Sequence, residues 1–229
     1  MASLIESFKL ISTDSNFLTK IGIFSLIPFT VHTLISDKIL LFKGSGALFV
    51  IILSLIYFGI LLQTLSNSIQ EKAELLPNYN VFKLFVVGVK GFISTGPVIF
   101  LSFLAHKKIL LALNTTLLLS KIILTVVYLF LISFVISSII FYSKNLKIYD
   151  GLNIKKILKN FHEVIPYLAI TIIVCALVNL IISLPIGFMI YGLFHVGKIL
   201  NFAISIIITT NLLCLFQNFS QLYFEQFKD

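Results

Sequence analysis

His32 is the first residue in this 229-residue chain with the means to do chemistry inside an apolar segment. It follows Pro28 by four residues in the stretch IPFTVHT, toward the outer end of a predicted membrane span. Histidine titrates near neutral pH, so His32 is a candidate for a proton-linked or ligand-contacting group. We favour the structural alternative, in which His32 hydrogen-bonds to Thr30 or Thr33 near the membrane interface.

His162 and Glu163 are adjacent and resemble an acid and base pair. Neighbouring residues of a helix point about 100° apart, however, which favours a solvated polar face over a shared site. The two remaining histidines and both cysteines lack the spacing of a metal site. None of the motifs HExxH, GxSxG, GxxxxGK or GxGxxG occurs. The sequence therefore predicts a protein that is not an enzyme and holds no cofactor or metal.

Three amides complete the set of intramembrane candidates. Asn179 and Asn211 lie deep in apolar runs, and Gln217 lies nearer the end of the last run. Amides in lipid ordinarily hydrogen-bond between helices, and the alternative is that they line a transport path. We expect no buried carboxylate and no intramembrane lysine pair, which argues against an ion-coupled pump.

The elements that position these residues follow from composition. Hydrophobic residues make up 59% of the chain and charged residues 11%, with a mean hydropathy of +1.08. A helix needs about 20 apolar residues to cross a bilayer. Six stretches meet or approach this length: Lys20–Ser36, Gly46–Asn67, Gly88–Leu104, Lys121–Ser143, Ile165–Tyr191 and Leu200–Gln221. Residues 109–119 are apolar but too short to span, and are a re-entrant turn, an interfacial helix or an extension of the fourth span. We predict an all-α polytopic membrane bundle forming a single domain over residues 1–229.

Lysine supplies all of the basic charge, because the chain has no arginine. Six spans place both termini on one side, which carries eleven of the seventeen lysines. The positive-inside rule then predicts that both termini are in the cytoplasm of a multi-pass cell-membrane protein. The lysines lie between apolar segments and form no solvent-facing domain, so the net charge of +8 favours anionic lipids as partners and argues against nucleic acid.

A lysine precedes a proline at nearly the same spacing three times: Lys20 to Pro28, Lys90 to Pro97, and Lys159 to Pro166. We interpret this as three diverged units, about 1–70, 71–147 and 148–229, each an amphipathic interfacial helix followed by a helical pair. In this interpretation each proline marks the turn into the bilayer. Asn153 is the predicted helix cap in the third unit, and Asn78 or Asn80 in the second. The alternative is that any interfacial helix end needs lysine, proline and small polar residues.

The interfacial helices identify the expected lipid contacts. The third presents an apolar stripe that includes Ile154, Ile157 and Leu158, and the opposite face is polar. Such helices lie in the membrane surface with their lysines toward head groups. The predicted head-group contacts are Lys83, Lys90, Lys155, Lys156 and Lys159. The second span of each unit also ends in a polar tail, with QTLSN at 63–67 matched by QNFSQ at 217–221.

The order FKLISTDSNFLTKIGIFSLIP, LPNYNVFKLFVVGVKGFI and a closing LFQNFSQLYFEQF covers nearly the whole chain. It resembles a prokaryotic multi-pass membrane family known only as a domain of unknown function. More distantly, it is similar to the membrane domain of some glycerophosphodiester phosphodiesterases, whose catalytic barrel is absent here. The resemblance implies an all-helical integral membrane protein and carries over no substrate, cofactor or catalytic residue.

These observations predict a non-enzymatic protein of a prokaryotic cytoplasmic membrane that interacts with lipids or with another membrane component. A partner membrane protein or a second copy of the chain stays open as that component. The alternative function is a small transporter or permease subunit with a route between the helical pairs, contacted by His32, Asn179 or Asn211.

Overall fold

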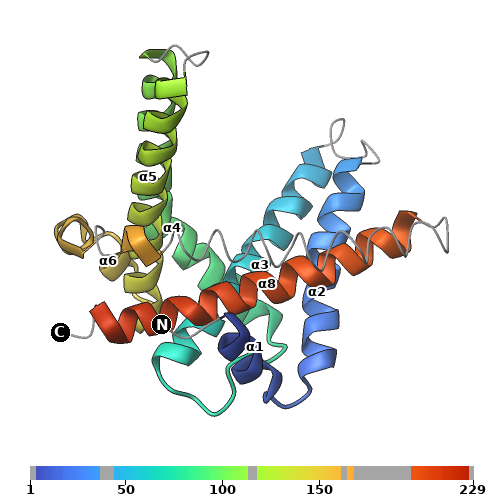
Figure 1. The fold of residues 1–229 in the computed structure, drawn as a ribbon. Helices are drawn as coiled ribbons and strands as arrows, with labels where there is room; N and C mark the ends of the chain where they lie inside the picture. The colour runs from blue at the N-terminus through green and yellow to red at the C-terminus, as the bar shows by residue number, and fades with distance from the viewer. Residues whose placement is uncertain (1–3, 37–43, 113–117, 161–163, 168–196, 227–229) are drawn as a thin grey trace.

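The computed structural model describes residues 4–36, 44–112, 118–160, 164–167 and 197–226, and every regular element in these ranges is a helix. Figure 1 shows two long hairpins, α2 with α3 and α4 with α5, and the last helix α8 crossing α2 and α3. The chain is thus an all-α polytopic helix bundle. The bounds are α1 Leu4–Ser12, α2 Phe17–Ser36, α3 Gly44–Ile69, α4 Val81–Ala112, α5 Leu118–Asn145, α6 Ile148–Gly151 and α8 Gly197–Gln226.

Five of the described helices are long and apolar enough to cross a membrane. The qualifying segments are Phe17–Ile35, Gly46–Ile69, Val81–Ile109, Ile122–Asn145 and Ile199–Phe224, in agreement with predicted spans one to four and six. The predicted fifth span, Ile165–Tyr191, lies outside the described residues apart from its first three. Length and hydropathy thus make this a membrane protein.

The structure differs from the predicted helix boundaries at the prolines and after the third span. The interfacial segment before Gly88 and the span after it form one helix, α4, which passes through Pro97, and α2 likewise passes through Pro28. Proline does not end these helices because neighbouring groups in a membrane bundle can satisfy the carbonyl that it frees. Residues 109–112 continue the third span as the end of α4, a placement outside the three alternatives, whereas residues 118–119 extend the fourth span, as one alternative predicted. Residues 113–117 lie outside the described residues.

Glycines allow α3 and α4 to pack in close contact. A Cβ at Gly59 would overlap the carbonyl of Leu84, and a Cβ at Gly88 would overlap the carbonyl of Leu55. Small residues serve this purpose in lipid, where helices associate by packing and not by a hydrophobic force. The Tyr142 hydroxyl of α5 donates to the Val87 carbonyl of α4 at 2.9 Å. This bond holds α5 against the part of α4 that contacts α3.

The chain after α5 folds back onto the second hairpin. Ser94 of α4 donates to the Ile148 carbonyl at 2.8 Å, and Ser138 of α5 donates to the Gly151 carbonyl at 2.6 Å. A side chain at Gly151 would overlap the Ser94 hydroxyl, so this close approach requires glycine. A helical segment, 154–160, begins directly afterwards with Asn153 as its cap. These bonds hold that segment at the end of the bundle where α5 finishes.

α8 packs against α3, α2 and α1. Ser220 accepts a hydrogen bond from Ser68 of α3 at 2.6 Å, and Thr209, earlier in α8, accepts one from Tyr57 of α3 at 3.1 Å. Residues far apart in sequence thereby place the end of α8 beside the polar end of α3.

Candidate functional site: the polar junction between α3 and α4

The polar end of α3 folds the following loop back on itself. Asn67 donates through Nδ2 to the Leu75 carbonyl at 3.1 Å, and its Oδ1 accepts from Gln63 Nε2 at 2.8 Å and from Lys72 Nζ at 3.1 Å. Glu71 adopts a left-handed backbone with φ of 53°, which ends the helix in the usual way for an αL cap. The three side chains and one carbonyl make a single hydrogen-bonded turn over residues 63–75.

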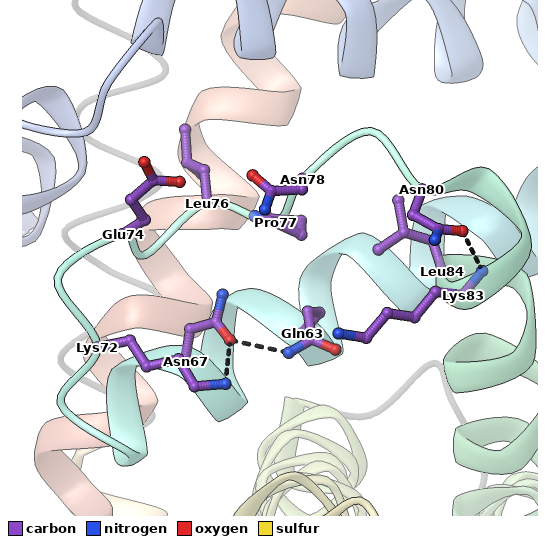
Figure 2. Close-up of a pocket in the computed structure, with 10 residues that line it drawn as sticks. All are labelled: Gln63, Asn67, Lys72, Glu74, Leu76, Pro77, Asn78, Asn80, Lys83 and Leu84. Carbon is purple, nitrogen blue, oxygen red and sulfur yellow. Dashed lines mark hydrogen bonds between the residues drawn. The ribbon is translucent and has the colours of Figure 1, made fainter.

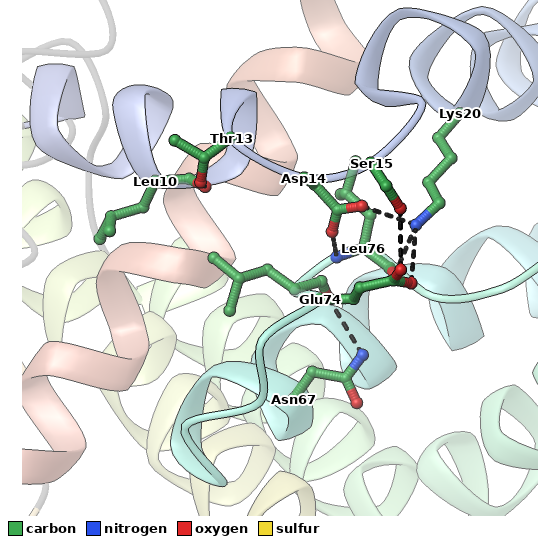
Figure 3. Close-up of polar contacts among 9 residues, drawn as sticks. Leu10, Thr13, Asp14, Ser15, Lys20, Asn67, Glu74 and Leu76 are labelled. Carbon is green, nitrogen blue, oxygen red and sulfur yellow. Dashed lines mark hydrogen bonds and ion pairs between the residues drawn. The ribbon is translucent and has the colours of Figure 1, made fainter.

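The corner between α1 and α2 is tied to the same loop by a buried ion pair. Lys20 Nζ lies 2.7 Å from Asp14 Oδ1, with the Lys20 side chain 3% exposed and the Asp14 side chain 0% exposed. Asp14 Oδ2 accepts from the Leu76 N–H at 2.7 Å, and Lys20 also donates to the Leu76 carbonyl at 3.3 Å. Figure 3 shows these side chains facing the loop after α3. The corner between α1 and α2 is thereby joined to a loop about sixty residues away in the sequence.

Glu74 closes this network at its exposed side. Its carboxylate accepts from the Ser15 hydroxyl at 2.8 Å and lies 3.4 Å from Lys20 Nζ, while its own side chain is 51% exposed. The Ser15 hydrogen bond, followed by the attraction of the Lys20 ammonium, lowers the pKa of Glu74 below its usual range. Glu74 is therefore ionised under ordinary conditions and directs its charge at the α1–α2 corner.

A cavity of about 400 Å³ lies on the other side of the loop. Figure 2 shows α3, the loop and the start of α4 contributing its walls, with the Lys83 side chain extending toward Gln63. Gln63, Asn67, Lys72 and Lys83 supply polar groups, while Leu76, Pro77 and Leu84 supply an apolar wall. The arrangement suits a ligand that combines an anion with a hydrogen-bond donor and a small apolar surface.

The predicted helix caps explain why Lys83 faces this cavity. Asn80 Oδ1 accepts from the Lys83 N–H at 3.0 Å, so Asn80 caps α4, and Asn153 caps the segment 154–160 in the same manner through the Lys156 N–H at 3.1 Å. Both cap predictions are confirmed, with Asn80 chosen over Asn78. The cap sets the first turn of α4 beside the end of α3.

The five lysines predicted to contact head groups are all exposed. Lys83 and Lys90 lie in the first three turns of α4, and Lys155, Lys156 and Lys159 lie in the segment 154–160. Because α3 ends, α4 begins and α5 ends on one side of the hairpins, the five lie at the same end of the bundle. Ile157 of the predicted stripe is buried, while Ile154 and Leu158 are exposed. Contact between the five lysines and lipid head groups stays a prediction.

The predicted intramembrane contacts are not gathered into one site by the described residues. His32 is exposed on α2, and the Thr30 and Thr33 hydroxyls donate to the Leu26 and Phe29 carbonyls one turn earlier and not to His32. A hydroxyl in a helix readily bonds to that carbonyl.

The amides fall into separate places. Asn211 is half-buried in α8, while Gln217, six residues later, is buried with no partner for Oε1 among the described residues. Six residues correspond to about 600° of helix rotation, so the two side chains face different directions. Asn179 lies outside the described residues, as do His162 and Glu163.

Sequence reasoning missed the residues at the centre of this junction. The expectation of no buried carboxylate is wrong, because Asp14 is buried against Lys20. The available signal was a single acid six residues before a lysine, in a short polar turn between apolar helices. Gln63 and Asn67 were noticed only as a polar tail, although their spacing of four residues places them on one helix face.

Comparison with known proteins adds no relative. No family model, curated protein or solved structure matches the chain. The resemblance to a membrane family of unknown function therefore stays a prediction. Within the described residues, no group of three or more His, Cys, Asp or Glu side chains is placed to hold a metal ion.

Proposed function

We propose that this membrane protein is non-enzymatic and that its lysine-bearing end binds anionic lipid head groups at the cytoplasmic face of a prokaryotic cell membrane, with both termini cytoplasmic. The observation that carries the proposal is the joint placement of Lys83, Lys90, Lys155, Lys156 and Lys159. All five are exposed at the end of the bundle shared by α3, α4 and α5.

The segment 154–160 supports this role by its amphipathic exposure. Ile157 is fully buried and anchors the segment, whereas Leu158 is 54% exposed beside Lys155 and Lys159. A helix lying in the membrane surface places such an apolar side chain among acyl chains and its lysines among head groups. Each lysine near an anionic surface contributes about 1 kcal/mol of attraction.

A tryptophan introduced near these lysines would measure the local lipid directly, because the chain has none. We expect Leu158→Trp, in full-length protein reconstituted in phosphatidylcholine, to be quenched more by brominated phosphatidylglycerol than by brominated phosphatidylcholine. Adding Lys155→Gln, Lys156→Gln and Lys159→Gln should remove most of this difference, and so should high salt, because it screens exposed charges.

Phe100→Trp is the matched control, because Phe100 is also an exposed apolar residue but lies in the middle of α4. We expect the two brominated lipids to quench it equally. Equal quenching at position 158, or a preference there that survives the triple lysine change and high salt, would show that these lysines do not recruit anionic lipid.

A further inference from the structure

The hydrogen bonds around Gln63 determine which of its atoms is left for a ligand. Asn67 must present Oδ1 toward Gln63, because its Nδ2 donates to the Leu75 carbonyl at 3.1 Å. Gln63 must therefore donate through Nε2, which lies 2.8 Å from Asn67 Oδ1. Its Oε1 is then an acceptor that is buried in the cavity wall and has no partner among the described residues. A buried acceptor without a donor is costly, so this atom calls for a donor from a ligand.

The same cavity also offers positive charge. In the part of the chain that the structure describes, the Lys83 ammonium has no hydrogen bond or ion pair, and its side chain extends toward Gln63 (Figure 2). Lys72 adds a second ammonium, which Asn67 orients at 3.1 Å. Glu74 also borders the cavity, but its carboxylate is bound to Ser15 and Lys20. The site therefore combines two ammonium groups with one neutral acceptor around a single cavity.

The surroundings of the cavity indicate a membrane lipid more than a soluble molecule. Val81 and Phe82 precede Lys83 at the start of α4 and are 58% and 77% exposed. At the end of a membrane-spanning helix such apolar side chains contact acyl chains. A head group held at Lys83 would thus have its lipid tails beside Phe82. A volume of about 400 Å³ is within the range of small-molecule sites.

We propose that this cavity binds the head group of a glycerophospholipid whose phosphate pairs with Lys83 and Lys72 and whose terminal hydroxyl or ammonium donates to Gln63 Oε1. The inference rests on the proposed function and deepens it. Non-specific attraction by lysines requires only negative charge, whereas this site also requires a donor on the head group.

The decisive comparison uses two lipids with one negative charge each. Phosphatidylglycerol carries head-group hydroxyls, and phosphatidylmethanol has the same phosphate diester without any. We expect native mass spectrometry of the full-length protein, titrated in detergent, to give about fivefold to tenfold tighter binding of phosphatidylglycerol, the effect of one hydrogen bond. Equal affinity of the unaltered protein for the two lipids would overturn the proposal without recourse to any variant.

Two substitutions assign the contacts. Gln63→Met keeps the length of the side chain but removes the acceptor. We expect this variant to bind phosphatidylglycerol and phosphatidylmethanol with about equal affinity. Lys83→Met should weaken both lipids about tenfold, because it removes a charge-assisted contact with the phosphate. Lys108→Met is the matched control, since Lys108 is an exposed lysine near the other end of the same helix, outside the cavity lining and outside the five proposed head-group contacts, and it should leave the discrimination unchanged. Discrimination that survives Gln63→Met would place the donor contact elsewhere and overturn the assignment.

Competition with a soluble phosphate ester shows whether the bound phosphate belongs to a lipid or to a soluble molecule. Glycerol 3-phosphate in millimolar excess should not displace phosphatidylglycerol if the tails contribute, and displacement would identify a soluble ligand in place of a lipid. The experiments distinguish failure of the proposed lysine–lipid attraction from failure of the proposed head-group site. The quenching at position 158 reports the charge-driven preference, and the phosphatidylmethanol comparison reports the donor site, so either can fail alone.

Discussion

Removing the Asp14 carboxylate should destabilise the protein far more than removing an exposed charge. At 2.7 Å and an effective dielectric constant of about 20, the attraction between Asp14 and Lys20 is roughly 6 kcal/mol, and it offsets the cost of taking both charges out of water. Asp14→Asn leaves the Lys20 ammonium buried, with the half-exposed Glu74 at 3.4 Å and the Leu76 carbonyl at 3.3 Å. Breaking a buried pair costs about 3–5 kcal/mol, and these remaining contacts lead us to expect about 3 kcal/mol.

The double variant makes this expectation specific to the pair. Asp14→Asn with Lys20→Met removes both buried charges, so we expect it to cost at least about 2 kcal/mol less than the sum of the single changes. The measurement is the free energy of unfolding, obtained by titrating SDS into dodecyl maltoside micelles and following helix content by circular dichroism. Lys90→Met, at an exposed position, should change it by less than about 0.5 kcal/mol. Additive single effects, or an Asp14→Asn cost as small as that of Lys90→Met, would refute the assigned role of the ion pair.

Two further predictions concern the same junction. Because the pKa of Glu74 is lowered by the Ser15 hydroxyl and the Lys20 ammonium, its stabilising effect is complete above the unfolded carboxyl pKa and is lost as pH falls through the lowered value. Below about pH 4.5 the unfolding temperature of Glu74→Gln should therefore fall less steeply with decreasing pH than that of the unaltered protein. The same pH dependence in both proteins would contradict this. Gly59→Ala should cost about 1–3 kcal/mol because its Cβ overlaps the backbone of α4. Gly22→Ala, which has nothing within 4 Å, should be neutral or stabilising in the same unfolding assay, and equal costs at the two glycines would contradict the close helix contact.

Much of the architecture could be read from local sequence. Long apolar runs predicted spans one to four and six, because a helix that satisfies its own backbone is the available way to cross lipid in an all-helical protein. The caps at Asn80 and Asn153 were also predictable, since a cap depends on a side chain and an N–H three residues away. The behaviour of Pro28 and Pro97 was not, because proline weakens a helix locally while the surrounding bundle determines whether the helix continues.

The candidate site depended on contacts that no local pattern contains. Asp14 meets the Leu76 backbone across 62 residues, and the opening between α3 and α4 depends on how closely Gly59 and Gly88 let the two helices approach. Exposure of the five lysines followed from their positions at helix ends, whereas the unpaired Gln63 oxygen followed only from the bonds made by its neighbours.

By itself the sequence determined that this chain is an all-helical membrane protein with its lysines at helix ends, because hydrophobicity and helix length are properties of contiguous residues. Only the tertiary structure decided that Asp14 and Lys20 form a buried pair, and that Gln63, Lys72 and Lys83 border one cavity. These facts depend on the packing of helices distant in sequence, where burial and hydrogen-bond partners are assigned by neighbours that the local sequence does not specify.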